Sequence, residues 1–170
     1  SLNREGRYKV LIKRNDLEDM IIEVEGVRAV DGRDIDAVAE EIADASYIAT
    51  SVGKAALPKT APAIAAGLRA RSENKAGGID IILAENIRNA SKEFREMLEQ
   101  RLSADPPDVL DFLERNVGIV ETSIGKMVPI MTDEDRAKDP LWVFAEPYNT
   151  LIVDGRAFVN ELPEIETLKP

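Results

Sequence analysis

The stretch that decides the fold is IDIILAENIRNASKEFREML, residues 79–98. Its first part is a run of apolar β-forming residues that stops at the polar pair Glu85-Asn86. Its second part has the apolar spacing of an amphipathic helix, with Phe94 and Leu98 on one face. Open α/β sheets bind their ligands at the carboxyl ends of their strands. An acid and an amide at this strand end therefore indicate a ligand site.

A second strand and helix precede this stretch. Residues 47–53, YIATSVG, are typical of a short buried strand. Residues 55–78 are typical of a helix whose prolines stand early, where a missing amide hydrogen costs least. Before them, Asp34 is expected to cap a helix over residues 34–45. Strands that alternate with helices at this spacing predict βαβ units, and therefore an α/β fold with a parallel sheet and flanking helices.

The two ends of the chain have a β-rich character. Residues 8–13 and 19–30 predict an antiparallel strand pair, joined by the polar turn at 14–18. A short helix is expected later, with Asp105 as its cap and Pro106 at its first position. Further strands are predicted by apolar runs at residues 117–129, 141–147 and 150–155.

The charge and the missing residue types exclude several functions. With 22 Lys and Arg against 32 Asp and Glu, the net charge is −10, which argues against binding to nucleic acid or to an anionic membrane. Because the chain has no His and no Cys, it cannot form a Ser-His-Asp triad, an HExxH zinc site or a disulfide. The lack of Cys fits a cytoplasmic protein. Any chemistry must use Lys, carboxylates, amides or a cofactor.

The strand predicted at 47–53 ends in a loop of small residues. Thr50 and Ser51 offer hydroxyl groups, and Gly53 allows the backbone to approach a ligand closely. Amide hydrogens at the start of the next helix favour an anionic group there. An ordinary strand-to-helix turn is the alternative interpretation, because such turns occur in every α/β fold.

The polar pair after the next strand offers more specific chemistry. The amide of Asn86 can donate to a carbonyl or alkoxide oxygen and accept from a hydroxyl at the same time. Its alternative role is a cap on the following helix, for which Asn89 and Ser91 compete. Glu85 can bind a ribose hydroxyl, or it can pair with a neighbouring Lys or Arg.

Other charged residues also have competing interpretations. Lys126, at the end of an apolar strand, can bind an anionic substrate group or simply extend into solvent. The acidic residues Asp133, Glu134 and Asp135 follow Thr132 and are typical of a helix start, with divalent metal binding as the minor alternative. We predict no metal site.

No GxGxxG spacing occurs among the ten glycines, so the usual phosphate loop of a dinucleotide fold is missing. A series of motifs nevertheless runs through the chain in a fixed order. The motifs are LNREGRYKV (2–10), VEGVRAV (24–30), ATSVG (49–53), APAIAAGL (61–68), IDIILAEN (79–86), VGIVETSIGKMVP (117–129), DPLWVFAEPYNTLIVD (139–154) and ELPEIETLKP (161–170). With this series the chain resembles the mannitol-1-phosphate 5-dehydrogenase family of the polyol-specific long-chain dehydrogenases.

The resemblance implies an NAD-binding Rossmann domain that passes hydride between nicotinamide and a sugar alcohol or its phosphate. On this basis residues 1–104 are expected to be the C-terminal part of that domain, without its first βαβ unit. Residues 105–170 are expected to be a β-rich extension that leads toward a helical substrate domain. The resemblance also implies that residues 50–53, Glu85 and Asn86 border the cofactor. Asn86 matches the family's asparagine that holds the reacting oxygen, which makes it the candidate catalytic residue.

Departures from the family pattern shape the expectation for this chain. The family's Lys-x4-Asn-x3-His pattern does not occur, and Gly125-Lys126 stand where many members carry Asp-Arg. We therefore expect an internal fragment of a longer dehydrogenase, inactive alone and self-associating through an exposed sheet edge, with the exact polyol left open. The alternatives are a non-catalytic interaction or regulatory domain on the same scaffold, and a short enzyme that uses its own Lys and carboxylate groups.

Overall fold

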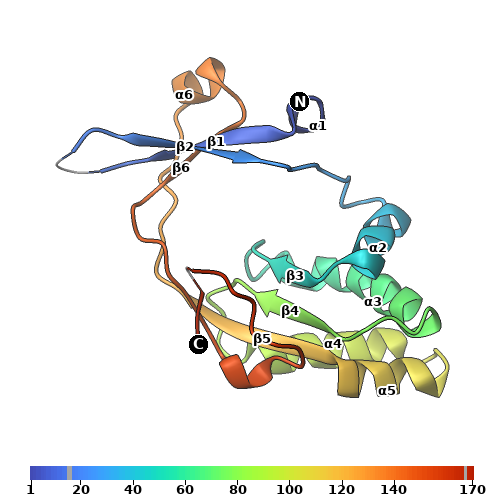
Figure 1. Ribbon diagram of the computed structural model, residues 1–170. Coiled ribbons are helices and arrows are strands. Elements are labelled where there is room, and N and C mark those ends of the chain that lie inside the picture. The colour runs from blue at the N-terminus through green and yellow to red at the C-terminus, as the bar shows by residue number, and fades with distance from the viewer. Residues whose placement is uncertain (15–16, 167) are drawn as a thin grey trace. The chain divides into compact units, whose positions relative to one another are not determined.

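The computed structural model describes residues 1–14, 17–166 and 168–170, and Figure 1 labels its helices and strands. The chain divides into two compact units. The first consists of Ser1–Ala29 and Gly125–Thr150, and the second of Val30–Ile124 and Leu151–Pro170. The domain boundary expected between residues 104 and 105 was inferred from the family resemblance, and it stays a prediction. The compact units themselves separate at other positions.

The first unit is built on a three-stranded sheet. Strand β1 (Arg7–Ile12) lies in its centre, antiparallel to β2 (Met20–Glu25) and parallel to β6 (Trp142–Ala145). The predicted antiparallel pair is therefore confirmed, while residues 15 and 16 of its predicted turn lie outside the described residues. The unit also contains the short helices α1 (Leu2–Glu5) and α6 (Asp133–Lys138).

The second unit contains a five-stranded sheet in the order β3-β4-β5-β7-β8. Its strands are β3 (Tyr47–Thr50), β4 (Ile79–Leu83), β5 (Val117–Ile124), β7 (Leu151–Val153) and β8 (Leu168–Lys169). Its helices are α2 (Ile35–Asp44), α3 (Leu57–Glu73), α4 (Ala90–Leu102), α5 (Pro107–Asn116) and the 3-10 helix η1 (Gly155–Ala157). Strands β3, β4 and β5 are parallel, β7 is antiparallel to β5, and β8 is parallel to β7. The predicted α/β fold, with a parallel sheet, flanking helices and a β-rich extension, is confirmed.

Strand β4 is the centre of the second unit, and all of its residues are buried. Its alternate side chains face opposite sides of the sheet, as the two-residue repeat of a strand requires. Ile81 packs with Phe94 and Leu98 of α4 in the main core, whereas Ile82 packs with Val120 and with β7 on the other face. Helices α3, α4 and α5 thus cover one face of the parallel strands, which Figure 1 shows.

Side-chain caps fix the starts of two helices as the sequence predicted. Asp34 accepts a hydrogen bond of 3.1 Å from the N–H of Ala37 at the start of α2. Thr132 and Asp135 form a capping box at the start of α6, so the acidic residues there mark a helix start. Among the described residues, no group of three or more Asp, Glu, His or Cys is arranged to hold a metal ion. No helix in this part of the chain is long and apolar enough to cross a bilayer.

Helices α2 and α3 pack closely at Gly67, which leads to a first prediction. A Cβ atom at position 67 would lie 2.3 Å from Cγ2 and 2.5 Å from Cβ of Ile42. We expect Gly67→Ala to lower the free energy of unfolding by about 1–3 kcal/mol, because the helices must move apart. Urea denaturation measures this loss. Gly77→Ala is the control, because a Cβ there meets no described atom within 4 Å. Equal losses in both variants would contradict the packing argument.

The predicted cap at Asp105 is wrong. Helix α5 begins at Pro107, with Pro106 in the N-cap position. The carboxylate of Asp105 instead accepts hydrogen bonds from Nε and Nη2 of Arg69, each 2.7 Å long. A two-pronged bond to a guanidinium outcompetes the single hydrogen bond of a helix cap. Residue Asp105 therefore ties α5 to α3.

This ion pair predicts a pH dependence of stability. Arg69 holds the pKa of Asp105 below its usual value, chiefly through the side-chain hydrogen bond. The pair therefore stabilises the fold above about pH 4, the usual carboxyl pKa, and this contribution is lost as the pH falls through the lowered pKa. We expect Arg69→Gln to lower Tm at neutral pH and to converge with the wild type in acid. A difference in Tm that is independent of pH would contradict this.

Candidate functional site

The carboxyl ends of three parallel strands gather at one edge of the second unit's sheet. Thr50 of β3 lies opposite Leu83 of β4, and Leu83 lies opposite Glu121 of β5. The loops that follow β3 and β4 therefore leave the sheet at the same edge, as predicted. Residues 50–53 and the pair Glu85-Asn86 meet there.

Glu85 holds the loop that follows β3. The residue is only 5% exposed. Its carboxylate accepts hydrogen bonds from the N–H of Val52 at 2.7 Å and from the N–H of Gly53 at 2.8 Å. Gly53 has a φ of +81°, which residues with a Cβ rarely adopt. The alternative prediction paired Glu85 with a neighbouring Lys or Arg, and no such ion pair is found among residues 1–14, 17–166 and 168–170. The N–H groups of Val52 and Gly53 thus bind a carboxylate of the protein itself. The anionic group expected at the start of the next helix, α3, stays a prediction.

The side-chain amide of Asn86 forms two hydrogen bonds with the backbone of Ile124, the last residue of β5. Its Nδ2 donates to the carbonyl oxygen of Ile124 at 2.8 Å, and its Oδ1 accepts from the N–H of Ile124 at 2.9 Å. These two bonds fix the orientation of the amide, because the reversed amide would set one donor against another. One Nδ2 hydrogen and one Oδ1 lone pair are not used by Ile124. Asn86 is not the helix cap, because Asn89 occupies the N-cap position of α4.

The hydroxyl groups at the end of β3 differ in their surroundings. Thr50 is 4% exposed, and its Oγ1 has no hydrogen-bond partner among the described residues. Ser51 and Val52 are exposed. A buried hydroxyl without a partner is rare in folded proteins. The N–H groups of Val52 and Gly53 are already bound to Glu85, so these two groups cannot also bind a phosphate.

Two side chains of β5, Glu121 and Thr122, form hydrogen bonds to α4 and β4 at the same edge of the sheet. Oε1 of Glu121 accepts hydrogen bonds from the N–H of Ser91 at 3.0 Å and from its hydroxyl at 2.8 Å, which caps the start of α4. The hydroxyl of Thr122 donates to the carbonyl oxygen of Leu83 at 2.7 Å. The ends of β4 and β5 and the start of α4 therefore belong to one hydrogen-bond network.

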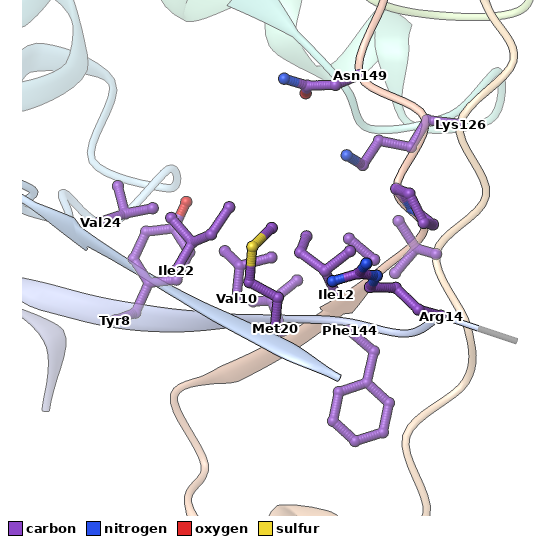
Figure 2. Close-up of a pocket in the computed structure, with 14 residues that line it drawn as sticks. Tyr8, Val10, Ile12, Arg14, Met20, Ile22, Val24, Lys126, Phe144 and Asn149 are labelled. Carbon is purple, nitrogen blue, oxygen red and sulfur yellow. The ribbon is translucent and has the colours of Figure 1, made fainter. Parts of the chain in front are cut away.

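Lys126 lies in the first unit and lines an apolar groove there (Figure 2). The groove has a volume of about 790 Å³. Aliphatic and aromatic side chains of β1, β2 and β6 form most of its lining, and Arg14 and Asn149 contribute polar groups besides Lys126. Lys126 is half-buried. Its role in substrate binding stays a prediction.

Two buried charged residues were missed from the sequence. Asp80 in β4 is fully buried and accepts hydrogen bonds from the N–H of Val159 at 2.8 Å and from the side-chain amide of Asn160 at 2.8 Å. Arg71 in α3 is buried and binds backbone carbonyl groups. A charge inside an apolar pattern needs internal partners. The acid within IDIIL was therefore a signal that could have found Asp80.

The chain is similar to one family model over nearly all of its length. The model of the mannitol dehydrogenase Rossmann domain matches residues 1–167. The mannitol-1-phosphate 5-dehydrogenase of Brevibacillus brevis is 33% identical over 165 residues, which cover 97% of this chain and 40% of that protein. The enzyme of the same name from Lactiplantibacillus plantarum is 33% identical over 147 residues, which cover 85% of this chain and 36% of that protein. The chain thus spans about two fifths of the length of these relatives.

Solved structures share the fold at low sequence identity. D-sorbitol dehydrogenase in substrate-free form has a TM-score of 0.79 and 14% identity, over 98% of this chain and 42% of that one. Pseudomonas fluorescens mannitol 2-dehydrogenase, in a ternary complex with NAD and D-mannitol, has a TM-score of 0.78 and 13% identity, over 97% of this chain and 42% of that one. The match of the family model and the shared fold show that the chain belongs to the mannitol dehydrogenase family, whose Rossmann domain it matches.

Proposed function

We propose that this chain is the NAD-binding part of an oxidoreductase that transfers hydride between nicotinamide and a sugar alcohol or a sugar-alcohol phosphate. The observation that carries the proposal is the position of Asn86 just beyond a central parallel strand, with one amide hydrogen that Ile124 does not use. The names of the relatives agree with it, since they include mannitol-1-phosphate 5-dehydrogenase and a mannitol 2-dehydrogenase seen with NAD and D-mannitol.

Each residue at the sheet edge has a defined task in this proposal. Asn86 donates its remaining amide hydrogen to the oxygen of the reacting carbon, which stabilises the alkoxide charge that develops when a general base of the complete enzyme takes the hydroxyl proton. Thr50 and Ser51 offer hydroxyl groups to the cofactor, and the backbone of Val52 and Gly53 borders it. When bound, NAD supplies the hydride acceptor. Asn86 is thus the catalytic residue of the chain.

Lys126 is proposed to bind the anionic group of the substrate. Lys126 is half-buried and lines an apolar groove, and a cation beside apolar side chains attracts a phosphate more strongly than a fully solvated one. A sugar-alcohol phosphate therefore fits this residue better than a neutral sugar alcohol does.

The test is an assay of the complete gene product with NAD and, in separate reactions, mannitol, sorbitol and mannitol 1-phosphate. The absorbance of NADH reports turnover. We expect at least one polyol to be oxidised, with the lowest KM for the phosphorylated substrate if Lys126 binds the phosphate. Failure to bind NADH contradicts the proposal, and so does NADH binding without turnover of any polyol.

A non-catalytic interaction domain on the same scaffold is the second candidate. Exposed apolar side chains on the sheet of the first unit favour it, among them Met20, Ile22 and Val143. Strand β3 also lies at a sheet edge, where it pairs only with β4 among the described strands. Such surfaces promote self-association. A stable oligomer in light scattering without affinity for NADH would favour this candidate, and polyol turnover would exclude it.

We place either form in the cytoplasm, because a chain without Cys cannot form the disulfides that an oxidising compartment favours.

A further inference from the structure

Glu85 uses both of its carboxylate oxygens on the loop that follows β3. Oε1 binds the N–H of Val52 at 2.7 Å, and Oε2 binds the N–H of Gly53 at 2.8 Å. Successive backbone N–H groups that point at one spot form an anion-binding concavity. Here the anion is built into the chain, and it is buried.

The next residue, Asn86, binds on the other side of β4, at the end of β5. Asn86 pairs with both backbone groups of Ile124 at the end of β5, whereas Glu85 reaches the loop after β3. Because β4 lies between β3 and β5, these adjacent side chains connect the ends of all three strands. A change in the loop at Val52 and Gly53 would therefore be passed to Asn86 through one peptide unit.

We infer that Glu85 is a positioning residue, an internal anion that holds the Val52–Gly53 loop against the end of β4 and occupies the two N–H groups that could otherwise bind a phosphate. The link to the cofactor rests on the proposed function, in which this loop borders NAD. The loop then presents a fixed backbone to an uncharged part of the cofactor, and the phosphates bind elsewhere. Glu85 itself does not touch the reacting atoms.

A carboxylate is required at this position for a chemical reason. Two N–H donors need two acceptors, and the two oxygens of a carboxylate supply them with charge-assisted hydrogen bonds. Glutamine supplies one acceptor and sets its own NH₂ group against the second backbone N–H. Glu85→Gln therefore keeps the shape of the side chain and removes one of the two bonds.

The first measurement is hydrogen–deuterium exchange of the complete gene product, followed in peptides that contain Val52 and Gly53. The amides of Val52 and Gly53 are expected to exchange faster in Glu85→Gln than in the wild type, whereas the amides of α5 are expected to exchange at the wild-type rate. Glu114→Gln is the matched control, because it makes the same chemical change on an exposed residue of α5. Unchanged exchange at Val52 and Gly53 would overturn the inference.

The second measurement is the affinity for NADH together with the steady-state constants. Loss of one charge-assisted bond is expected to raise the Kd for NADH and the KM for NAD about tenfold in Glu85→Gln, with less change in kcat. Faster exchange with unchanged NADH affinity would overturn the positioning role.

If the wild-type protein binds no NADH, the proposed function fails, while the exchange data still decide whether Glu85 holds the loop. Should Glu85→Gln not fold, Glu85→Asp, which keeps the charge but is one methylene shorter, is measured in the same way and is expected to show the same faster exchange.

Discussion

Replacing Asn86 by alanine is expected to lower kcat for polyol oxidation by about 10²–10³-fold. The variant loses the amide hydrogen that the proposed function assigns to the reacting oxygen. That donor acts mainly on the charge that develops in the transition state, so the Kd for NADH is expected to change much less than kcat. Stopped-flow or steady-state rates, together with a titration of NADH, measure the two effects separately.

The loss of the Asn86 side chain also removes its two bonds to Ile124, so the free energy of unfolding of the variant is measured in urea beside its kcat, which separates catalysis from folding. Asn89→Gly deletes an amide three residues further on, at a position whose φ of +59° glycine adopts readily. This variant is expected to keep the wild-type kcat. If Asn86→Ala keeps the wild-type kcat as well, Asn86 does not act on the reacting oxygen.

Replacing Arg71 by methionine is expected to lower the free energy of unfolding by about 3–4 kcal/mol. Its guanidinium lies between the end of α2 and the loop that precedes β4, and it donates to carbonyl oxygens of both. These belong to Ile42, Ala43, Ala45, Gly77 and Gly78. Methionine fills a similar volume but leaves the buried carbonyl groups without these donors, and it removes a cation from a helix C-terminus.

Equilibrium denaturation in urea tests the effect of Arg71→Met, with the slope m expected to stay constant. The control is Arg69→Met on the same helix. Arg69 pairs with Asp105 at a partly exposed position, so its replacement should produce a clearly smaller loss. Equal losses in the two variants would show that the carbonyl groups near Arg71 find other partners, and would contradict the proposed role.

The elements that follow a simple hydrophobic pattern were predictable. The run at residues 79–83, apolar except for Asp80, became a fully buried strand, and the apolar spacing after it became helix α4, in which Phe94 and Leu98 are buried. These predictions succeeded because the spacing of apolar residues along the chain reports directly which face of an element is buried. Asp105 failed as a cap because its competing partner, Arg69, stands 36 residues away and does not enter a local pattern.

The sequence by itself determined the α/β class, the order of strands and helices from α2 to β5, and the placing of Glu85 and Asn86 just beyond a buried strand. Only the tertiary structure decided what these side chains bind. Glu85 reaches amides 32 and 33 residues earlier in the chain, and Asn86 reaches a residue 38 positions later. The physical reason is that a hydrogen bond requires its atoms to lie within about 3 Å. That distance is set by which strands become neighbours in the sheet, and not by separation along the chain.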